Sequence, residues 1–280
     1  MTRNLRSSTG RRGRRPLLAQ TAQALYNTII KALAYTKGIS LVDINKLVKH
    51  CKKTLDLKNA NLSDSYYYTS LPLCIIDAVY SIGVRYTSTY RVVERYCKYY
   101  DIPMFRSKTF EYPCTELQLT VSSFTNSIES LGVEHFANNV FSNLQKTSTK
   151  SGILKAEAVY LWAKIFERHG VEVFQDLNKI DKQVENKILS IKGQKSGISL
   201  SYFLMLSGSD DLCKPDRHIL RFISEALQQE VKNPSEAQSI IHTATEILKK
   251  TYPHITVKLL DNTIWKYMSK FGRPRRSSLQ

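Results

Sequence analysis

The sequence contains few cysteines, and none is spaced as a zinc-binding or disulfide-forming pair. Five occur in 280 residues, an odd number, and no two form a C-x-x-C motif. Neither a disulfide framework nor a zinc ribbon is indicated, and we expect a reducing, intracellular compartment. The six histidines show no H-x-x-x-H spacing, so we predict no metal in catalysis.

Long apolar runs and alternating apolar patterns are missing as well. No stretch approaches the roughly 18 apolar residues of a membrane span, and the first residues lack the apolar core of a secretory signal. The best strand candidate is "HITVKLL", residues 254–260, and it has no evident partner strand. We therefore predict an all-α protein that does not associate with membranes.

Acidic residues are in deficit relative to basic ones. Lysine and arginine total 41 against 24 aspartates and glutamates, which gives a formal net charge of +17. This charge favours a polyanionic partner, although a basic soluble protein with no such partner is the alternative. Residues 1–16 contain six arginines and are typical of a disordered basic arm, and residues 273–280 form a second basic tail.

Apolar residues recur at helical intervals along most of the chain. No internal repeat is evident, and Gly170 is expected to end one of the longer helices. The spacing predicts helices within 17–53, a helix pair joined by a turn over 73–100, shorter helices in 115–131 and 134–145, an amphipathic helix over 152–169, one over 182–191, and several after residue 196.

The stretch "SIKGQKSGIS", residues 190–199, places two glycines and two lysines between two of these helices. Glycine permits close backbone approach, and the N–H groups that open the second helix would form a phosphate site. Lys192 and Lys195 would add positive charge to that contact. An ordinary helix–helix turn is the alternative interpretation.

Together with the segment that follows, this turn forms the unit "ILSIKGQKSGISLSYFLMLSGSDDLCKPDRHILRFI". The unit resembles the core of the helix-hairpin-helix DNA glycosylases, the superfamily of endonuclease III and 8-oxoguanine glycosylase. Their core reads roughly L-P-G-x-G-x-K-x-A, then an apolar helix, then V-D-x-H-x-x-R. The matching positions here are Ile191, Gly193, Ser199, Asp216, His218 and Arg221.

The resemblance implies a two-lobed helix-hairpin-helix DNA glycosylase-like fold. Residues 70–210 would form a six-helix lobe that includes the hairpin. A second lobe would combine N-terminal helices in 17–69 with C-terminal helices in 211–272. The implied partner is double-stranded DNA, bound by a monomer across the cleft between the lobes, in the cytoplasm or nucleoid or in the nucleus.

The resemblance also assigns roles to individual residues. Asp216 would be the catalytic carboxylate, and its alternative role is a helix N-cap after Pro215. The phosphate-binding hairpin would comprise Lys192, Gly193, Gln194, Lys195, Ser196 and Gly197. A base pocket would include Asp77, Tyr86, Tyr90 and His218, for each of which packing in the protein interior is the alternative.

Several positions depart from the family pattern. Lys195 replaces the second hairpin glycine, and Gly197 stands where bifunctional members place a Schiff-base lysine. No cysteine follows Asp216, which excludes the iron–sulfur cluster of endonuclease III, and we expect no cofactor. By resemblance, the hairpin carbonyls could still hold a monovalent ion.

These departures predict a monofunctional glycosylase without lyase activity, since lyase chemistry needs an amine nucleophile. One alternative is a non-catalytic DNA-binding protein that retains the fold. Another is a helical protein-interaction domain whose basic tails bind RNA.

Overall fold

The computed structural model describes residues 40–108 and 111–271, and this part of the chain is helical. Its only β-type pairings are two isolated bridges, Tyr68 with Phe105 and Lys146 with Leu154, so the all-α prediction is confirmed for the described residues. No helix in these ranges is both long and apolar enough to span a bilayer. The predicted basic arm, the helix expected before residue 40 and the basic tail lie outside the described residues.

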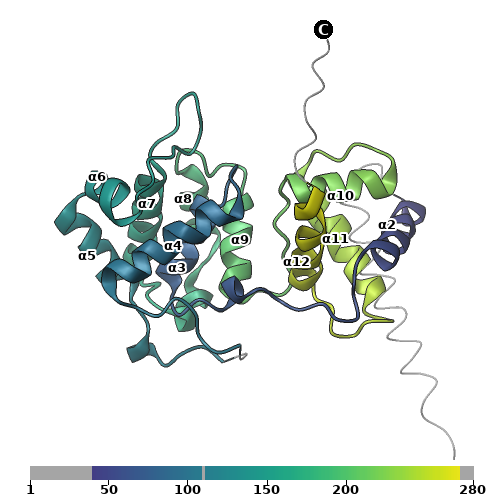
Figure 1. Cartoon of the computed structure of the whole chain (residues 1–280), viewed down its shortest axis with the longest axis horizontal. Helices are drawn as coiled ribbons and strands as arrows, with labels where there is room; N and C mark the ends of the chain where they lie inside the picture. The colour runs from purple at the N-terminus through teal and green to yellow at the C-terminus, as the bar shows by residue number, and fades with distance from the viewer. Residues whose placement is uncertain (1–39, 109–110, 272–280) are drawn as a thin grey trace, which may run out of the picture.

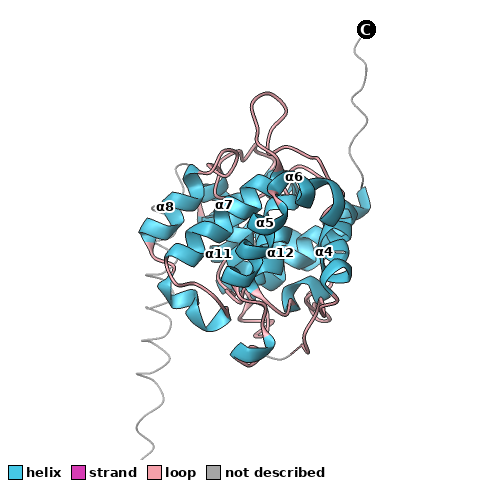
Figure 2. Cartoon of the chain, turned by 90° about the vertical axis from the view of Figure 1, so that its left-hand side faces the viewer, coloured by secondary structure: helices cyan, strands magenta, loops and turns pink. Residues whose placement is uncertain are grey.

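Turns and longer loops connect the helices, and short 3₁₀ segments lie between several of them. Figure 2, coloured by secondary structure, shows helices and loops only. The helices are α2 (Leu41–Thr54), α3 (Leu71–Tyr80), α4 (Tyr86–Tyr100), α5 (Val121–Leu131), α6 (Val133–His135), α7 (Lys155–Arg168), α8 (Lys182–Ser190), α9 (Ile198–Leu206), α10 (Arg217–Leu227), α11 (Pro234–Leu248) and α12 (Val257–Met268).

The described helices form two lobes, each with its own hydrophobic core (Figure 1). The first lobe comprises α3 to α9, and its core collects buried side chains from Tyr66 to Leu206. The second lobe joins α2 to the C-terminal helices α10, α11 and α12. The segment from Ser207 to Asp216 connects the lobes, and it carries the residue that was predicted to be catalytic.

The centre of the first lobe is helix α3, which is buried along its whole length. Its sequence, LPLCIIDAVY, is apolar on every face except at Asp77, which is why this helix can be surrounded by α4, α7 and α9. Aromatic side chains of α7 and α9 fill the space beside it, with the Phe166 and Phe203 ring centroids 5.2 Å apart. A polar residue at the centre of such a core needs partners.

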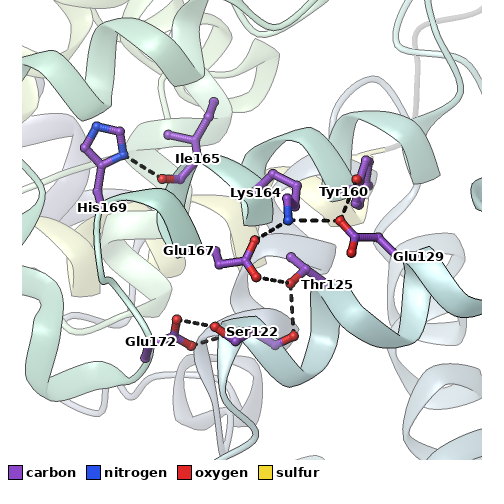
Figure 3. A network of polar contacts seen from close by, with 9 residues as sticks. All are labelled: Ser122, Thr125, Glu129, Tyr160, Lys164, Ile165, Glu167, His169 and Glu172. Atoms are coloured by element: carbon purple, nitrogen blue, oxygen red, sulfur yellow. Dashed lines mark hydrogen bonds and ion pairs between the residues drawn. The ribbon is translucent and has the colours of Figure 1, made fainter.

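Helices α5 and α7 are joined at the surface by a network of polar side chains (Figure 3). The Lys164 ammonium lies 2.9 Å from Glu129 and 2.5 Å from Glu167, and these two hydrogen-bonded carboxylates raise its pKa. Tyr160 donates to Glu129 at 2.9 Å, and Thr125 donates to Glu167 at 3.1 Å. The network fixes how the two helices pack.

Polar side chains at the starts of several helices explain where those helices begin. Ser40 and Asp43 form a reciprocal capping box at α2, and these hydrogen bonds lower the pKa of Asp43 to about 2. Asp181 caps α8 by accepting from the Val184 N–H at 2.9 Å. At the other end of a helix, Gly170 follows α7 with φ of 66°, as expected for a residue just beyond a helix C-terminus.

Two sequence-based expectations differ from the structure. The strand candidate "HITVKLL" is instead the start of α12, because the Thr256 side chain accepts from the Leu259 N–H at 3.1 Å and caps a helix there. The helix expected over 134–145 ends early, in a π-turn over Phe136–Val140. Ser142 then adopts φ of 45°, which stops the helix.

Helix α12 supplies much of the contact between the lobes. The Trp265 ring packs edge-on against Tyr86 of α4, with centroids 5.5 Å apart. The Asn262 amide donates to Ser63 at 3.1 Å, and the Lys258 ammonium lies 2.8 Å from an Asp210 carboxylate oxygen. These contacts tie α12 to the start of α4, to the segment before α3 and to the interlobe segment.

Candidate functional site

A polar cluster lies where α3, α9 and the interlobe segment meet. Its centre is Asp77, which is fully buried within α3. The hydroxyls of Tyr68 and Tyr202 donate to the same carboxylate oxygen, Oδ2, at 2.9 and 3.4 Å. The other oxygen, Oδ1, has no hydrogen-bond partner among the described residues. The burial of this oxygen is therefore not compensated by a hydrogen bond from the described residues.

Burial raises the pKa of Asp77 to about 6, because removal from water disfavours the charged carboxylate. The positive charge of Lys214 and the two tyrosine hydrogen bonds oppose this rise. The carboxyl therefore changes protonation state close to neutral pH. Among the predicted pocket residues, Asp77 has the surroundings best suited to acid–base chemistry.

Lys214 is a member of this cluster that sequence reasoning missed. Its ammonium crosses from the interlobe segment to the first lobe, donates to the Ser81 hydroxyl at 2.9 Å and lies 3.9 Å from the centroid of the Tyr202 ring. Burial lowers its pKa, although the charges of Asp216, Asp77 and Asp261 oppose the effect. The available signal was its position between Cys213 and Pro215, two residues before Asp216.

The backbone of the interlobe segment is held in place by the second lobe. The Lys214 N–H donates to Asp261 of α12 at 2.9 Å, and the Cys213 N–H donates to Gln238 of α11 at 2.9 Å. Burial, reinforced by the charge of Asp216, raises the pKa of the Asp261 carboxyl well above its ordinary value. Two helices thus fix the position of the residues that precede Asp216.

Asp216 is the N-cap of α10. Its Oδ1 accepts from the His218 N–H at 2.8 Å, and its side chain is half-buried. Its second oxygen, Oδ2, makes no hydrogen bond to the described part of the chain. His218 is also half-buried, and burial lowers the pKa of its imidazole. The capping role predicted as an alternative is therefore observed, and it occupies only one of the two carboxylate oxygens.

The two predicted pocket tyrosines occupy different surroundings. Tyr86 lies at the contact between the lobes, against Trp265. Tyr90 lines a separate shallow hollow with Glu94, Lys98 and Phe105, although its ring centroid is 6.5 Å from that of Tyr86. The structure brings Asp77, Lys214 and Asp216 to one region and leaves Tyr90 directed elsewhere.

The glycine-rich hairpin connects α8 to α9. Lys192, Lys195 and Ser196 are exposed, whereas Gln194 is buried and its side chain is hydrogen-bonded to the Ser199 hydroxyl. Gly197 is the N-cap of α9 with φ of 73°, and no side chain caps this helix start. The Ile198 N–H donates to the Ser196 hydroxyl at 3.5 Å, whereas the next two N–H groups of α9 have no partner among the described residues. These two N–H groups can donate to an anion, with Lys192 and Lys195 nearby.

Gly193 is required by a contact within the protein. Its φ is 93°, and a Cβ at this position would lie 2.4 Å from the Cβ of Thr147. Thr147 belongs to the loop of residues 145–154, which is closed by the Thr147 N–H bond to the Ile153 carbonyl at 2.9 Å. The close approach that the sequence predicts for a phosphate is made here by this loop, in which Lys146 and Lys150 are exposed.

No described group of three or more histidine, cysteine, aspartate or glutamate side chains is arranged to bind a metal ion. The five cysteines are free, and only Cys114 is exposed. The chemistry available at the cluster is thus that of carboxylates, tyrosine hydroxyls and one lysine.

Comparison with known proteins assigns a family but no activity. No curated protein and no solved structure matches the chain. One family model, described as a domain of unknown function (DUF8548), matches residues 45–269, which include both lobes, the hairpin and the polar cluster. The chain therefore belongs to the DUF8548 family.

Proposed function

We propose that the protein binds double-stranded DNA and cleaves the N-glycosidic bond of a flipped, damaged or mismatched base, with Asp216 as the catalytic carboxylate. The observation that carries this proposal is that the two carboxylate oxygens of Asp216 have different partners. One oxygen caps α10, while the other makes no hydrogen bond to the described residues and the side chain remains partly exposed at the interlobe segment.

The proposed reaction needs a negative charge at this place. Departure of a base leaves an oxocarbenium-like sugar, and a carboxylate near C1′ stabilises the positive charge that develops there. The same carboxylate orients the water that attacks C1′. Because the cap fixes Asp216 Oδ1, the direction of the unbonded oxygen is defined before a substrate binds.

Asp77 supports the proposal as a proton source. Protonation of a purine helps it to leave, and a buried carboxyl with a pKa of about 6 retains a proton in a fraction of molecules at neutral pH. Lys214 links this acid to Asp216, because its charge acts on both carboxylates. The two acids have different surroundings, since Asp77 is fully buried and Asp216 is partly exposed.

The hairpin supports DNA binding. A backbone phosphate would accept from the N–H groups of Ser199 and Leu200, or replace the 3.5 Å bond of the Ile198 N–H to Ser196, next to Lys192 and Lys195. Helix α9 continues from this start to Tyr202, which stacks with Lys214. From Ile198 to Tyr202 the rise along the helix axis is only about 6 Å, so a strand held at the hairpin would lie close to the cluster.

A non-catalytic DNA-binding protein is the second candidate function. It is favoured by Gly197, which stands where bifunctional glycosylases carry their lysine, and by the capping hydrogen bond that already occupies Asp216. Both candidates predict DNA affinity that falls steeply with salt, because lysines and arginines release counterions from the phosphates that they contact. Only a measurement of base release distinguishes the glycosylase from the non-catalytic DNA-binding protein.

The deciding experiment is a glycosylase screen on duplexes that contain uracil, alkylated purines, oxidised purines or mismatches, followed by alkali to cleave abasic sites. Asp216→Asn keeps the cap and removes the charge, so base release is expected to fall by two orders of magnitude or more. Asp211→Asn is the matched control, since Asp211 is exposed in the same segment. If the protein binds DNA but releases a base from none of these duplexes, the non-catalytic alternative is favoured.

A further inference from the structure

A hollow of about 460 Å³ lies on the first lobe between the N-terminal half of α4 and residues 142–145. None of the described residues that line it is acidic, and three are arginines. The lining residues are Val84, Arg85, Thr87, Ser88, Arg91, Arg95, Ser142, Asn143 and Gln145.

The arginines are concentrated here by helical spacing. Ser88, Arg91 and Arg95 follow one another at intervals of three and four residues, so they share one face of α4. Arg85 precedes them as the N-cap of the helix, where no side chain caps the first N–H groups. Neither Arg85 nor Arg91 pairs with a carboxylate in the part of the chain that the structure describes.

Arg95 holds the opposite wall of the hollow. One of its Nη atoms donates to the carbonyls of Phe141 and Ser142, at 2.9 and 3.0 Å. Ser142 adopts φ of 45°, a conformation that non-glycine residues seldom adopt, and the chain then turns toward Asn143. The wall is therefore built and held in position before any ligand arrives.

The amide side chains on this wall are oriented by their own contacts. Asn143 uses its carbonyl oxygen to accept from the Gln145 N–H at 2.9 Å, which leaves its NH₂ group for a ligand. The Gln145 carbonyl oxygen faces the Lys155 ammonium at 3.4 Å, so its NH₂ group is likewise directed away from that lysine. Lys155 itself is buried and donates to the Tyr80 and Ile82 carbonyls at the end of α3.

We propose that this hollow binds a phosphate group, with Arg85 and Arg91 as charged donors and Asn143 and Gln145 as neutral ones. Guanidinium groups offer paired N–H donors that match phosphate oxygens, and amide NH₂ groups complete the coordination without adding charge. The hollow is larger than one phosphate and its volume of about 460 Å³ falls within the size range of small-ligand sites.

The phosphate could come from a DNA strand or from a free phosphate compound. It begins at Val84, three residues after Ser81, the partner of Lys214, and Tyr86 beside it touches the second lobe. A strand lying along the interlobe contact would place a backbone phosphate here. A free nucleotide or inorganic phosphate offers the same chemistry. The inference depends on the geometry of this hollow and not on base excision.

The test is titration of the full chain with inorganic phosphate, monitored by NMR of the side-chain NH₂ signals of Asn143 and Gln145 and by calorimetry. Saturable shifts of these signals are expected in the wild type, with acetate at equal ionic strength producing none. Arg91→Gln should weaken phosphate binding about tenfold, the usual effect of one charged hydrogen bond. Arg168→Gln is the matched control, because Arg168 is an exposed arginine on α7 without a described partner.

A short duplex DNA then distinguishes the two sources. Competition between the duplex and phosphate for the same signals assigns the site to the DNA backbone, and absence of competition assigns it to a free phosphate compound. Equal losses in Arg91→Gln and Arg168→Gln, or no shift of the two amide signals, would overturn the proposal. Because no base release is measured, failure of the proposed enzymatic activity leaves this result unaffected.

Discussion

The Lys214 ammonium lies 3.9 Å from the centroid of the Tyr202 ring, which couples the interlobe segment to α9. The same ammonium donates to Ser81 at the end of α3, and the Lys214 N–H donates to Asp261 of α12, so this residue ties two helices of the first lobe to the second lobe. A cation over an aromatic face, partly removed from water, contributes about 1–2 kcal/mol. Lys214 therefore serves both to join the lobes and to set the charge next to Asp77 and Asp216.

Replacing Lys214 by methionine should raise the pKa of Asp77 above its present value of about 6, because a positive neighbour that favours the carboxylate is removed. The free energy of unfolding should also fall by about 1–3 kcal/mol, as the cation–π contact and the Ser81 hydrogen bond are lost. Carboxyl NMR titration and urea denaturation measure the two effects. Lys214→Arg keeps the charge and should leave the Asp77 titration close to that of the wild type; an unchanged titration in Lys214→Met would show that the two groups do not interact.

Asp77 should make stability depend on pH in an unusual direction. Its carboxyl has a pKa of about 6 in the folded protein and an ordinary value of 3.8, so the folded state holds the proton more tightly than the unfolded state. The free energy of unfolding should consequently gain about 2 kcal/mol from this residue as the pH falls from 7 to 4. Above pH 7 the contribution vanishes.

The effect of Asp77 is isolated by comparison with Asp77→Asn, which cannot titrate. Other carboxylates, such as Asp43 with its lowered pKa, titrate in both proteins and cancel in the difference. Urea denaturation at pH 4, 5, 6 and 7 gives the two curves. Parallel curves for the wild type and the variant would mean that Asp77 is ionised with an ordinary pKa.

Local sequence patterns predicted the helices well, since capping residues and helical spacing are local signals. The α3–α4 pair, α7 with its following Gly170, and the cap formed by Asp216 all follow from neighbours within four residues. The interaction of Asp77 with Tyr202 joins residues 125 positions apart, and the sequence around neither residue predicts it. The role of Lys214 is hidden for the same reason.

At the hairpin, the sequence correctly predicted a tight turn at Gly193 but not the group that packs against it. Gly193 does adopt a positive φ, as a tight turn requires, but the nearest obstacle to a side chain is Thr147, 46 residues earlier. A glycine in a turn predicts a close approach and does not identify the approaching group. For that reason Gly193→Val alone cannot test phosphate binding.

A double-mutant cycle separates the two roles of Gly193. Gly193→Ala should destabilise the protein by about 1–3 kcal/mol, through the collision with Thr147 and through backbone strain at φ of 93°. Thr147→Gly removes the colliding Cβ, so the double variant should recover part of the loss. Thermal denaturation gives the coupling energy, and additive losses would show that Thr147 is not the obstacle.

The DNA affinity of the Gly193→Ala/Thr147→Gly double variant then tests whether the hairpin backbone contacts a phosphate. With the collision removed, a methyl group at residue 193 still projects from the turn beside exposed Lys192. Reduced affinity is expected if a phosphate approaches this backbone closely. Gly197→Ala is the comparison, because its added Cβ would lie 3.7 Å from the nearest side-chain atom and only the φ of 73° disfavours the substitution. Full DNA affinity in both variants would show that the turn only connects the two helices.

The reaction type is tested by trapping with borohydride. Under the proposed resemblance to helix-hairpin-helix glycosylases, Gly197 stands where bifunctional members carry a Schiff-base lysine. No covalent protein–DNA adduct is therefore expected on any substrate, and strand cleavage should require alkali or heat. Lys214 is the amine that most directly challenges this expectation, since burial lowers its pKa and it lies two residues before Asp216. In the structure, however, its ammonium is engaged by Ser81 and by the Tyr202 ring, which opposes nucleophilic attack. An adduct that forms with the wild type and disappears in Lys214→Met, but persists in a Lys195→Ala control, would identify Lys214 as a nucleophile and make the protein a bifunctional lyase.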